Sequence, residues 1–409
     1  MAIFPIFKVT VLSLCFSFVS CAQKQSLNSK KKEVSNTKNI KKEIVVAANS
    51  TKTYLPKLEG KKIAVVANQT SVISKRNGYT HLIDSLLSLD VNIKKIFAPE
   101  HGFRGKADAG EFVKDGIDTK TGLSIVSLHG QNKKPKPEQL KGIDLVIFDI
   151  QDVGVRFYTY IATLQLIMEA CAEAKVPVMV FDRPNPNGNY VDGPSMETEH
   201  TSFLGMQAIP LVYGMTIGEY AEMINNEGWL SDGNKADLTV IPLLHYTHDS
   251  DYSFAIRPSP NLPNDQSINL YPSLGLFEGT HINAGRGTEF QFQRYGASFL
   301  DSIAYDFNYV PKPNFGSKYP KEKGKICFGE DLSNHSKLNV VSLQWLIKAY
   351  QNCTDKTKFF NTDGFTKHAG TEKLQKQIEV GMSEAEIKAT WQADLETFKE
   401  VRKKYLRYD

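Results

Sequence analysis

The residues best suited to chemistry lie in segment 97–105, where a carboxylate, an imidazole and a guanidinium fall within five positions. These are Glu100, His101 and Arg104, with glycines interleaved. An apolar run at 91–97 precedes them and predicts a buried strand that ends just before the acid. Ionisable groups and glycines directly after a strand are typical of a ligand site at the carboxyl edge of an α/β sheet.

Four further segments gather acids, arginines, amides and aromatic residues. They supply Asp149, Arg156 and Tyr158 (residues 149–160), Asp182 and Asn185 (182–188), Asn261 (257–263), and Glu278, Arg286 and Glu289 (278–290). Carbohydrate sites have this composition, because aromatic rings pack on sugar faces while amides and acids bond the hydroxyls. Two carboxylates can cleave a glycosidic bond, one as acid and the other as base or nucleophile. An arginine can bind a substrate carboxylate through two parallel hydrogen bonds.

The usual cofactor and nucleophile motifs are absent from the sequence. There is no G-x-G-x-x-G after the first predicted strand, no Walker A motif, no G-x-S-x-G and no H-E-x-x-H. Each of these motifs places a specific group on a phosphate, an acyl carbon or a zinc ion. Dinucleotide, nucleotide triphosphate, nucleophile-elbow and zincin functions are therefore disfavoured, and we expect neither a cofactor nor a bound metal.

Apolar strands that alternate with helices must position these groups. Strands are expected at 61–69, 91–97, 123–128, 144–150 and 176–181, and helices at 79–89 and 159–174. Strands that are apolar throughout predict a mostly parallel sheet covered on both faces. We therefore assign residues 53–190 to a doubly wound, Rossmann-like α/β domain.

Polar residues follow these strands at the edge where open α/β sheets bind ligands. They are Asn68, Gln69, Glu100, His129, Asp149 and Asp182. Beyond residue 190 the alternation changes: a helix is expected at 216–227, a strand at 238–243, and loops at 257–296. A capping box at Ser383 and Glu386 begins a final helix. We expect residues 191–409 to form a smaller α+β C-terminal domain that completes a cleft.

The N-terminus has the features of a lipoprotein signal. Lys8 precedes an apolar stretch at 9–19, too short for a membrane anchor, and residues 18–21 end in Cys21. Residues 22–52 are rich in Lys, Ser and Asn, which predicts a disordered tether. This tether carries a net charge of +6 and the signal +1, so residues 53–409 carry −3 of the total +4. Nothing in the folded part therefore suggests a nucleic-acid partner.

Three cysteines remain beyond the signal, Cys171, Cys327 and Cys353. None has the C-x-x-C spacing of a metal or redox site, and buried free thiols are the expectation.

Taken together, residues 97–105, 149–160, 182–194, 213–219, 258–263 and 271–293 resemble the bacterial exo-β-N-acetylmuramidase family of the NamZ type. The resemblance covers residues 55–409. It implies a Rossmann-like N-terminal domain, a smaller C-terminal domain and a cleft between them. The implied activity is removal of non-reducing-end β-linked N-acetylmuramic acid from peptidoglycan fragments, for cell-wall turnover and recycling.

Residue roles follow from the resemblance less directly. Glu100 stands in the acidic strand-end motif and looks like the leading catalytic acid, with Glu289 as the second. The lactyl carboxylate of muramic acid needs a cation, which Arg104, Arg156 or Arg286 could supply. Residues 18–21 resemble the lipobox of bacterial lipoproteins, with Phe18 where Leu is usual, which implies lipidation at Cys21. The expected product is a periplasmic enzyme anchored to the membrane by this lipid.

Two alternatives from other classes stay open on the sequence. A non-catalytic lipoprotein that binds muropeptides or sugars would show much the same residues. A metal-dependent hydrolase could use Glu100, His101, Asp149 and Asp182 at the strand ends.

Overall fold

The structure is a computed structural model that describes residues 42–104 and 115–409. Residues 43–409 form one compact unit. The predicted signal, Cys21 and residues 22–41 of the predicted tether lie outside the described residues. Residues 43–52 are ordered, which corrects the tether prediction for that stretch. The reason is an apolar run in which Val46, Ala47 and Ala48 are at most 4% exposed and join a hydrophobic core.

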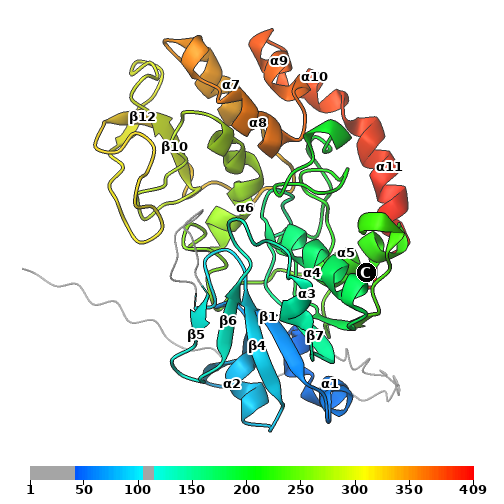
Figure 1. The fold of residues 1–409 in the computed structure, drawn as a ribbon. Coiled ribbons are helices and arrows are strands. Elements are labelled where there is room, and N and C mark those ends of the chain that lie inside the picture. Colours follow the sequence, from blue (N-terminus) through cyan, green and yellow to red (C-terminus); the bar gives the residue numbers. More distant parts are fainter. Residues whose placement is uncertain (1–41, 105–114) are drawn as a thin grey trace, which may run out of the picture. The chain divides into compact units, whose positions relative to one another are not determined.

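A seven-stranded sheet organises the first part of this unit (Figure 1). In spatial order its strands are β5 (Gly116–Ile117), β6 (Ser124–Ser127), β4 (Ile93–Ala98), β1 (Ile63–Ala67), β7 (Leu145–Asp149), β8 (Val178–Phe181) and β9 (Leu238–Ile241). All neighbours pair in parallel except β5 with β6. A separate hairpin joins β2 (Val72–Lys75) and β3 (Gly78–His81). The prediction of a mostly parallel sheet is confirmed.

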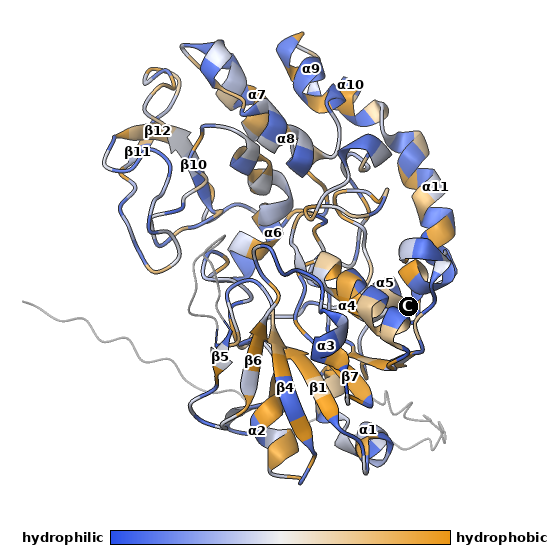
Figure 2. Cartoon of the chain, viewed as in Figure 1, coloured by the Kyte–Doolittle hydropathy of each residue, from blue (hydrophilic) through white to orange (hydrophobic). Residues whose placement is uncertain are grey.

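Both faces of the sheet are buried because β1 and β8 are apolar throughout and β7 is apolar up to Asp149 (Figure 2). Alternate residues of β1 face two different cores: Ala64 and Val66 join one, and Ile63 and Val65 the other. α1 (Thr51–Leu58) and α2 (Leu82–Leu87) supply side chains to the second core. α4 (Tyr160–Ala174) and α5 (Ile217–Asn226) supply side chains to the first core. α3 is a single helical turn at Pro137–Leu140.

The C-terminal part combines a small antiparallel sheet with helices. The sheet has the order β10 (Arg294–Ala297), β12 (Cys327–Asp331), β11 (Phe307–Tyr309). The helices are α6 (Asp265–Leu274), α7 (Gln344–Gln351), α8 (Thr362–Ala369), α9 (Lys373–Glu379), α10 (Glu384–Ala389) and α11 (Gln392–Lys403), with a 3-10 turn η4 (Gly275–Gly279) after α6. Their apolar side chains continue the first core of the sheet. The smaller α+β C-terminal part is thus as predicted.

Two boundaries differ from expectation. β9 lies beyond residue 190 yet pairs with β8, so the domain boundary that we placed there falls inside the sheet. The predicted helix 79–89 is instead the end of β3 followed by α2, because a tight turn at Gly78 (φ 114°) starts the returning hairpin strand. In the described residues, no helix combines the length and apolarity needed to cross a bilayer.

Candidate active site

A pocket of about 300 Å³ lies where the carboxyl edge of the sheet meets the C-terminal part. It is lined by Glu100, His101, Phe157, Tyr158, Thr159, Tyr160, Leu204, Ser259, Asn261, Leu262, Tyr271, Glu278, Arg286, Phe292 and His368. The lining thus joins six segments of the chain: 100–101, 157–160, 204, 259–262, 271–292 and 368. It contains six of the residues predicted for the site: Glu100, His101, Tyr158, Asn261, Glu278 and Arg286.

Glu100 is presented by the turn that follows β4. His101 and Gly102 both adopt positive φ (69° and 75°), and the amide of Gly102 closes the turn on Pro99. A left-handed histidine is strained by about 1–2 kcal/mol, which the surroundings must offset. Thr159, the residue before α4, donates its hydroxyl to Oε2 of Glu100 at 3.0 Å. The carboxylate is thereby held at the start of a fifteen-residue helix.

A proline-rich loop, residues 257–263, closes the same edge. The Tyr158 hydroxyl donates to the carbonyl of Pro258 at 2.8 Å, and burial raises the pKa of that hydroxyl well above 10. Oγ of Ser259 lies 3.3 Å from Nε2 of His101, so the side chain of this left-handed residue has a hydrogen-bond partner on the loop. Asn261 is 1% exposed, and its side-chain oxygen accepts no hydrogen bond from the described protein atoms. These contacts fix the position of the loop and place Asn261 at the pocket.

The opposite wall carries a preformed ion pair between Glu278 and Arg286. Arg286 donates from Nε and Nη2 to the two carboxylate oxygens, at 3.2 and 2.8 Å. Burial raises the pKa of Glu278, but the charges of Arg286 and Lys321 outweigh it, so the pKa is lowered below 4.5. Lys321 reaches this wall by donating to the carbonyls of residues 277, 278 and 280. Glu278 is therefore an ionised carboxylate at neutral pH.

Local backbone constraints put this pair in place. Gly279, next to Glu278, packs so tightly on α8 that a Cβ would lie 2.3 Å from Cα of Phe365. The arginine stands between Gly285 and Gly287, both at positive φ (77° and 78°). A turn of this kind needs glycine at those positions.

His368 is a pocket residue that the sequence analysis missed. Its Nδ1 lies 2.8 Å from the carbonyl oxygen of Gly364, and since a carbonyl only accepts, Nδ1 carries the proton. Burial lowers the pKa of the imidazole below 6.5 and outweighs the hydrogen bond to Gly364 and the charge of Glu278, which raise it. The neutral ring therefore offers Nε2 as a hydrogen-bond acceptor. No spacing relative to acids or other histidines marks this residue in the sequence.

The five Phe and Tyr residues of the pocket lining pack into one cluster, called the aromatic floor below. The Tyr271 ring on α6 meets those of Phe157, Tyr158 and Phe292 edge-on, with centroids 5.2, 6.1 and 4.8 Å apart. Such edge-to-face packing fixes ring orientation. Tyr160 faces Tyr158 at 4.8 Å and lies close to Glu100. Only Tyr158 of this group was predicted as a site residue, although the others lie in segments whose aromatic content was recognised.

Glu289, predicted as the second catalytic acid, does not line the pocket and is exposed. The turn that carries it explains this position. Thr288 donates its hydroxyl to the carbonyl of Gly285 at 2.7 Å and accepts the amide of Phe290 at 3.0 Å. This turn directs Arg286 toward Glu278 and leaves Glu289 on the surface. The acid that shares the pocket with Glu100 is Glu278.

The strand-end residues Asp149, Asp182 and Asn185 are likewise absent from the pocket lining, because each is engaged in the buried core. Asp149 forms a bidentate ion pair with Arg183 (2.6 and 2.8 Å), and Asp182 accepts bonds from Thr216, Gly218 and Tyr408. Burial raises the pKa of Asp182 to about 6. Asn185 donates to the carbonyl of Met215. These side chains anchor the loops above the sheet.

Arg104 and Arg156 also lie outside the pocket lining. Arg104 donates to both carboxylate oxygens of Asp118, at 3.3 and 2.8 Å. Arg156 is 1% exposed and donates to four backbone carbonyls, those of Pro194, Ile209, His368 and Ala369. Burial lowers its pKa to about 9. Of the three arginines considered for a substrate carboxylate, only Arg286 lines the pocket.

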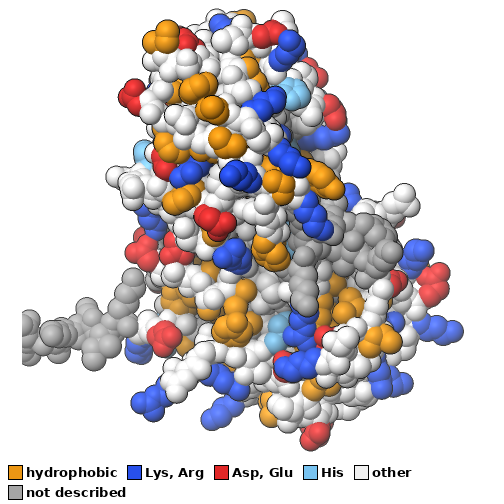
Figure 3. Space-filling model, turned by 90° about the vertical axis from the view of Figure 1, so that its left-hand side faces the viewer, with side chains coloured by type: hydrophobic (Ala, Val, Ile, Leu, Met, Phe, Trp, Pro, Cys, Tyr) orange, Lys and Arg blue, Asp and Glu red, His pale blue; other side chains and the backbone are white. Residues whose placement is uncertain are grey.

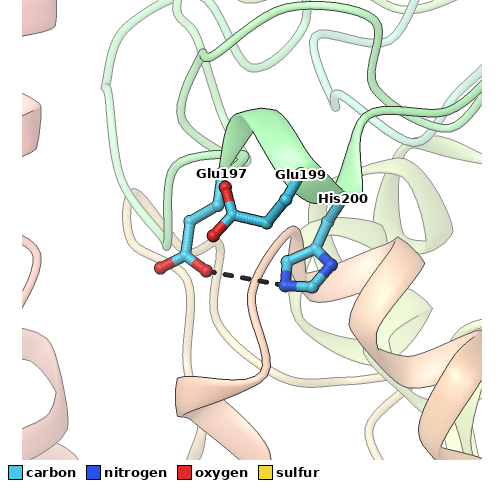
Figure 4. Close-up of side chains that lie close together, drawn as sticks. All are labelled: Glu197, Glu199 and His200. Carbon is cyan, nitrogen blue, oxygen red and sulfur yellow. Dashed lines mark ion pairs between the residues drawn. The ribbon is translucent and has the colours of Figure 1, made fainter.

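A possible cation site lies elsewhere. Among the described residues, one group of three could ligate a metal: Glu197, Glu199 and His200 (Figure 4). Lys373 already pairs with Glu197 at 2.7 Å, which supplies the positive charge there. None of these side chains lines the pocket. The cluster of Glu100, His101, Asp149 and Asp182 considered for a metal hydrolase does not form, because both aspartates are engaged with other partners.

The chemistry available in the pocket is that of two carboxylates with different settings. Glu278 is held ionised by two cations and can stabilise positive charge. Glu100 accepts a hydrogen bond from the Thr159 hydroxyl, lies beside the aromatic floor and is the candidate proton donor. Acid and base roles are commonly divided in this way, by environments that separate two carboxylates.

Comparisons with known proteins agree with this arrangement. Residues 63–266 match the family model "Exo-beta-N-acetylmuramidase NamZ, N-terminal", and residues 269–408 match its C-terminal counterpart. The chain is 38% identical over 373 residues to the peptidoglycan beta-N-acetylmuramidase NamZ of Bacillus subtilis, covering 87% of this chain and 89% of that protein.

Two crystal structures of DUF1343 family proteins from Bacteroides fragilis are also similar. They are 44% and 27% identical in sequence, with TM-scores of 0.82 and 0.75, and each comparison covers 90% of this chain and 99% of the other. Matched over both parts by these family models and over most of its length by a curated relative, the chain belongs to the exo-beta-N-acetylmuramidase NamZ family.

Proposed function

We propose that this protein is an exo-β-N-acetylmuramidase that releases non-reducing-end N-acetylmuramic acid from peptidoglycan fragments during cell-wall recycling. Family membership supports the activity. The observation that carries the assignment of residues is that Glu100 and Glu278 line one pocket of about 300 Å³. Paired carboxylates at one sugar-sized pocket are what glycosidic cleavage requires.

Within this proposal Glu100 protonates the leaving oxygen. Glu278 is a poor acid because its pKa is lowered, so it faces the developing positive charge of the sugar ring. Arg286 is the candidate for binding the lactyl carboxylate of muramic acid, since it is the pocket-lining arginine. Nε2 of His368 and the side-chain oxygen of Asn261 are acceptors suited to substrate N–H or O–H groups.

The test compares two identical substitutions at different places. Glu100→Gln should lower the release of N-acetylmuramic acid from a MurNAc–GlcNAc disaccharide at least about 100-fold, as expected for loss of a general acid. Glu289→Gln, on an exposed turn outside the pocket, should stay within about twofold of the parent enzyme. Near-normal release by Glu100→Gln would remove the catalytic assignment.

We further propose that the protein is a periplasmic lipoprotein anchored through Cys21. The support is sequence alone: a short apolar stretch after Lys8, the lipobox-like residues 18–21 and the polar composition of residues 22–41. Cys21→Ala should abolish labelling by radioactive palmitate and move the protein from the membrane to the soluble fraction. Unchanged labelling and membrane association in this variant would argue against the anchor.

A further inference from the structure

A loop comprising residues 312–321 borders the pocket and is fastened to two of its walls. Nδ2 of Asn261 donates to the carbonyl of Gly316 at 2.5 Å. The backbone amide of Lys312 donates to the carbonyl of Gly287, in the turn that carries the pocket arginine, at 2.8 Å. Both contacts use loop backbone, so they hold the loop in place whatever side chains it carries.

This rim loop exposes two large aromatic side chains. Phe315 is 60% exposed and Tyr319 is 88% exposed, and Phe315 directly precedes the glycine bonded to Asn261. Figure 3 looks onto the side of the molecule that bears the small antiparallel sheet, where hydrophobic side chains lie among Lys and Arg. Exposed aromatic rings beside a binding pocket gain free energy when a ligand covers them.

The size of the pocket indicates what that ligand is. A volume of about 300 Å³ is at the small end for ligand sites and suits one sugar ring with its substituents. If the pocket holds the muramic acid that is released, the sugar on the other side of the cleaved bond must lie outside it, against the rim.

We propose that Phe315 and Tyr319 form the binding surface for the leaving-group sugar, the amino sugar linked to the muramic acid that is cleaved off. This inference rests on the proposed exo-muramidase function. The rings stack on the apolar face of that sugar, and the contacts of the rim loop with Asn261 and Gly287 set which way the chain leaves the pocket. The rim loop thereby favours saccharide substrates over glycosides with small leaving groups.

Two substrates separate this role from catalysis. The first is the MurNAc–GlcNAc disaccharide, whose leaving sugar reaches the rim. The second is β-N-acetylmuramyl fluoride, whose one-atom leaving group cannot. Phe315→Ala and Tyr319→Ala should each lower kcat/KM on the disaccharide about fivefold, which corresponds to about 1 kcal/mol. Both variants should hydrolyse the fluoride at the parent rate, which also shows that they fold.

Tyr79→Ala is the matched control, because Tyr79 is 53% exposed on β3 and is not a pocket residue. It should leave both reactions unchanged. Equal losses on the two substrates, or no loss on the disaccharide, would overturn the rim assignment while leaving the muramidase function intact. Absence of turnover on both substrates by the parent protein would instead refute the proposed function on which the inference rests.

Discussion

The ion pair between Glu278 and Arg286 makes the electrostatics of the pocket testable by one substitution. Glu278→Gln keeps the size of the side chain and retains an oxygen that can accept from Arg286, whose Nε and Nη2 now donate to the two carboxylate oxygens. The change removes one negative charge from a wall that also holds Lys321. The pocket thus becomes more positive by one unit while its shape is preserved.

The expected loss of rate follows from this charge. The sugar ring carries positive charge in an oxocarbenium-like transition state. A unit charge about 6 Å away, at an effective dielectric constant of about 20, changes the energy of that charge by about 3 kcal/mol. This corresponds to a rate about 100-fold lower. The cost in stability is smaller, about 1–2 kcal/mol, because Arg286 keeps one hydrogen bond to the remaining side-chain oxygen and loses the second bond and its counter-charge, at a partly exposed site.

The same pair predicts a dependence of stability on pH. The folded-state pKa of Glu278 lies below its ordinary value of 4.5, because Arg286 and Lys321 outweigh the effect of burial. Its contribution to stability is therefore complete above the unfolded-state pKa and is lost as the pH falls through the folded-state pKa. The difference in unfolding free energy between the parent and Glu278→Gln should shrink as the pH is lowered below about 4.5.

The assay measures release of N-acetylmuramic acid at pH 7 and urea unfolding from pH 7 to the acid limit of folding, with Glu289→Gln as the matched control. Turnover by Glu278→Gln within fivefold of the parent would refute the argument that this carboxylate faces the reacting sugar. A stability difference that does not change with pH would refute the assignment of the lowered pKa.

Two further predictions concern the buried charged side chains of Arg156 and Asp149, which stabilise the structure around the pocket. Arg156→Met should lower the free energy of unfolding by about 4 kcal/mol, about 1 kcal/mol for each of the four hydrogen bonds that Arg156 donates to backbone carbonyls. A loss under about 1 kcal/mol in urea unfolding would contradict this. Asp149→Asn should cost about 3–5 kcal/mol, because it leaves the guanidinium of Arg183 buried without its counter-charge. An unchanged melting temperature in this variant would show that the ion pair contributes nothing.

The sheet could be predicted because its signal is local and redundant. Every residue of β1 and β7 is buried, which produces the continuous apolar runs that were taken as central parallel strands. The hairpin of β2 and β3 was missed for the opposite reason. Its outer residues are exposed and polar, and the apolar spacing of α2 directly after it is typical of a helix. The pattern at 82–87 therefore extended the predicted helix back into the strand.

The sequence could predict a pocket residue only where its position at the end of a strand is enough to bring its side chain to the pocket. Glu100 follows a strand of the sheet and reaches the pocket. Asp149 and Asp182 also stand at strand ends, yet they are buried away from the pocket. Asp149 accepts a hydrogen bond from Arg183, and Asp182 accepts one from Tyr408. The end of a strand predicts the backbone position of a residue. The partner of its side chain depends on contacts between distant segments of the chain.

Arg156 and Arg286 show how the same residue type takes opposite roles. Both follow glycine-containing segments with neighbouring acids, and nothing in their local sequence separates them. Arg156 meets carbonyls up to 213 residues away, including that of His368, so it fixes the backbone of one pocket residue without touching the pocket. Arg286 meets a carboxylate eight residues before it and remains at the pocket surface. Substituting Arg156 should thus disturb activity through the position of His368, which is a positioning role and not a contact with substrate.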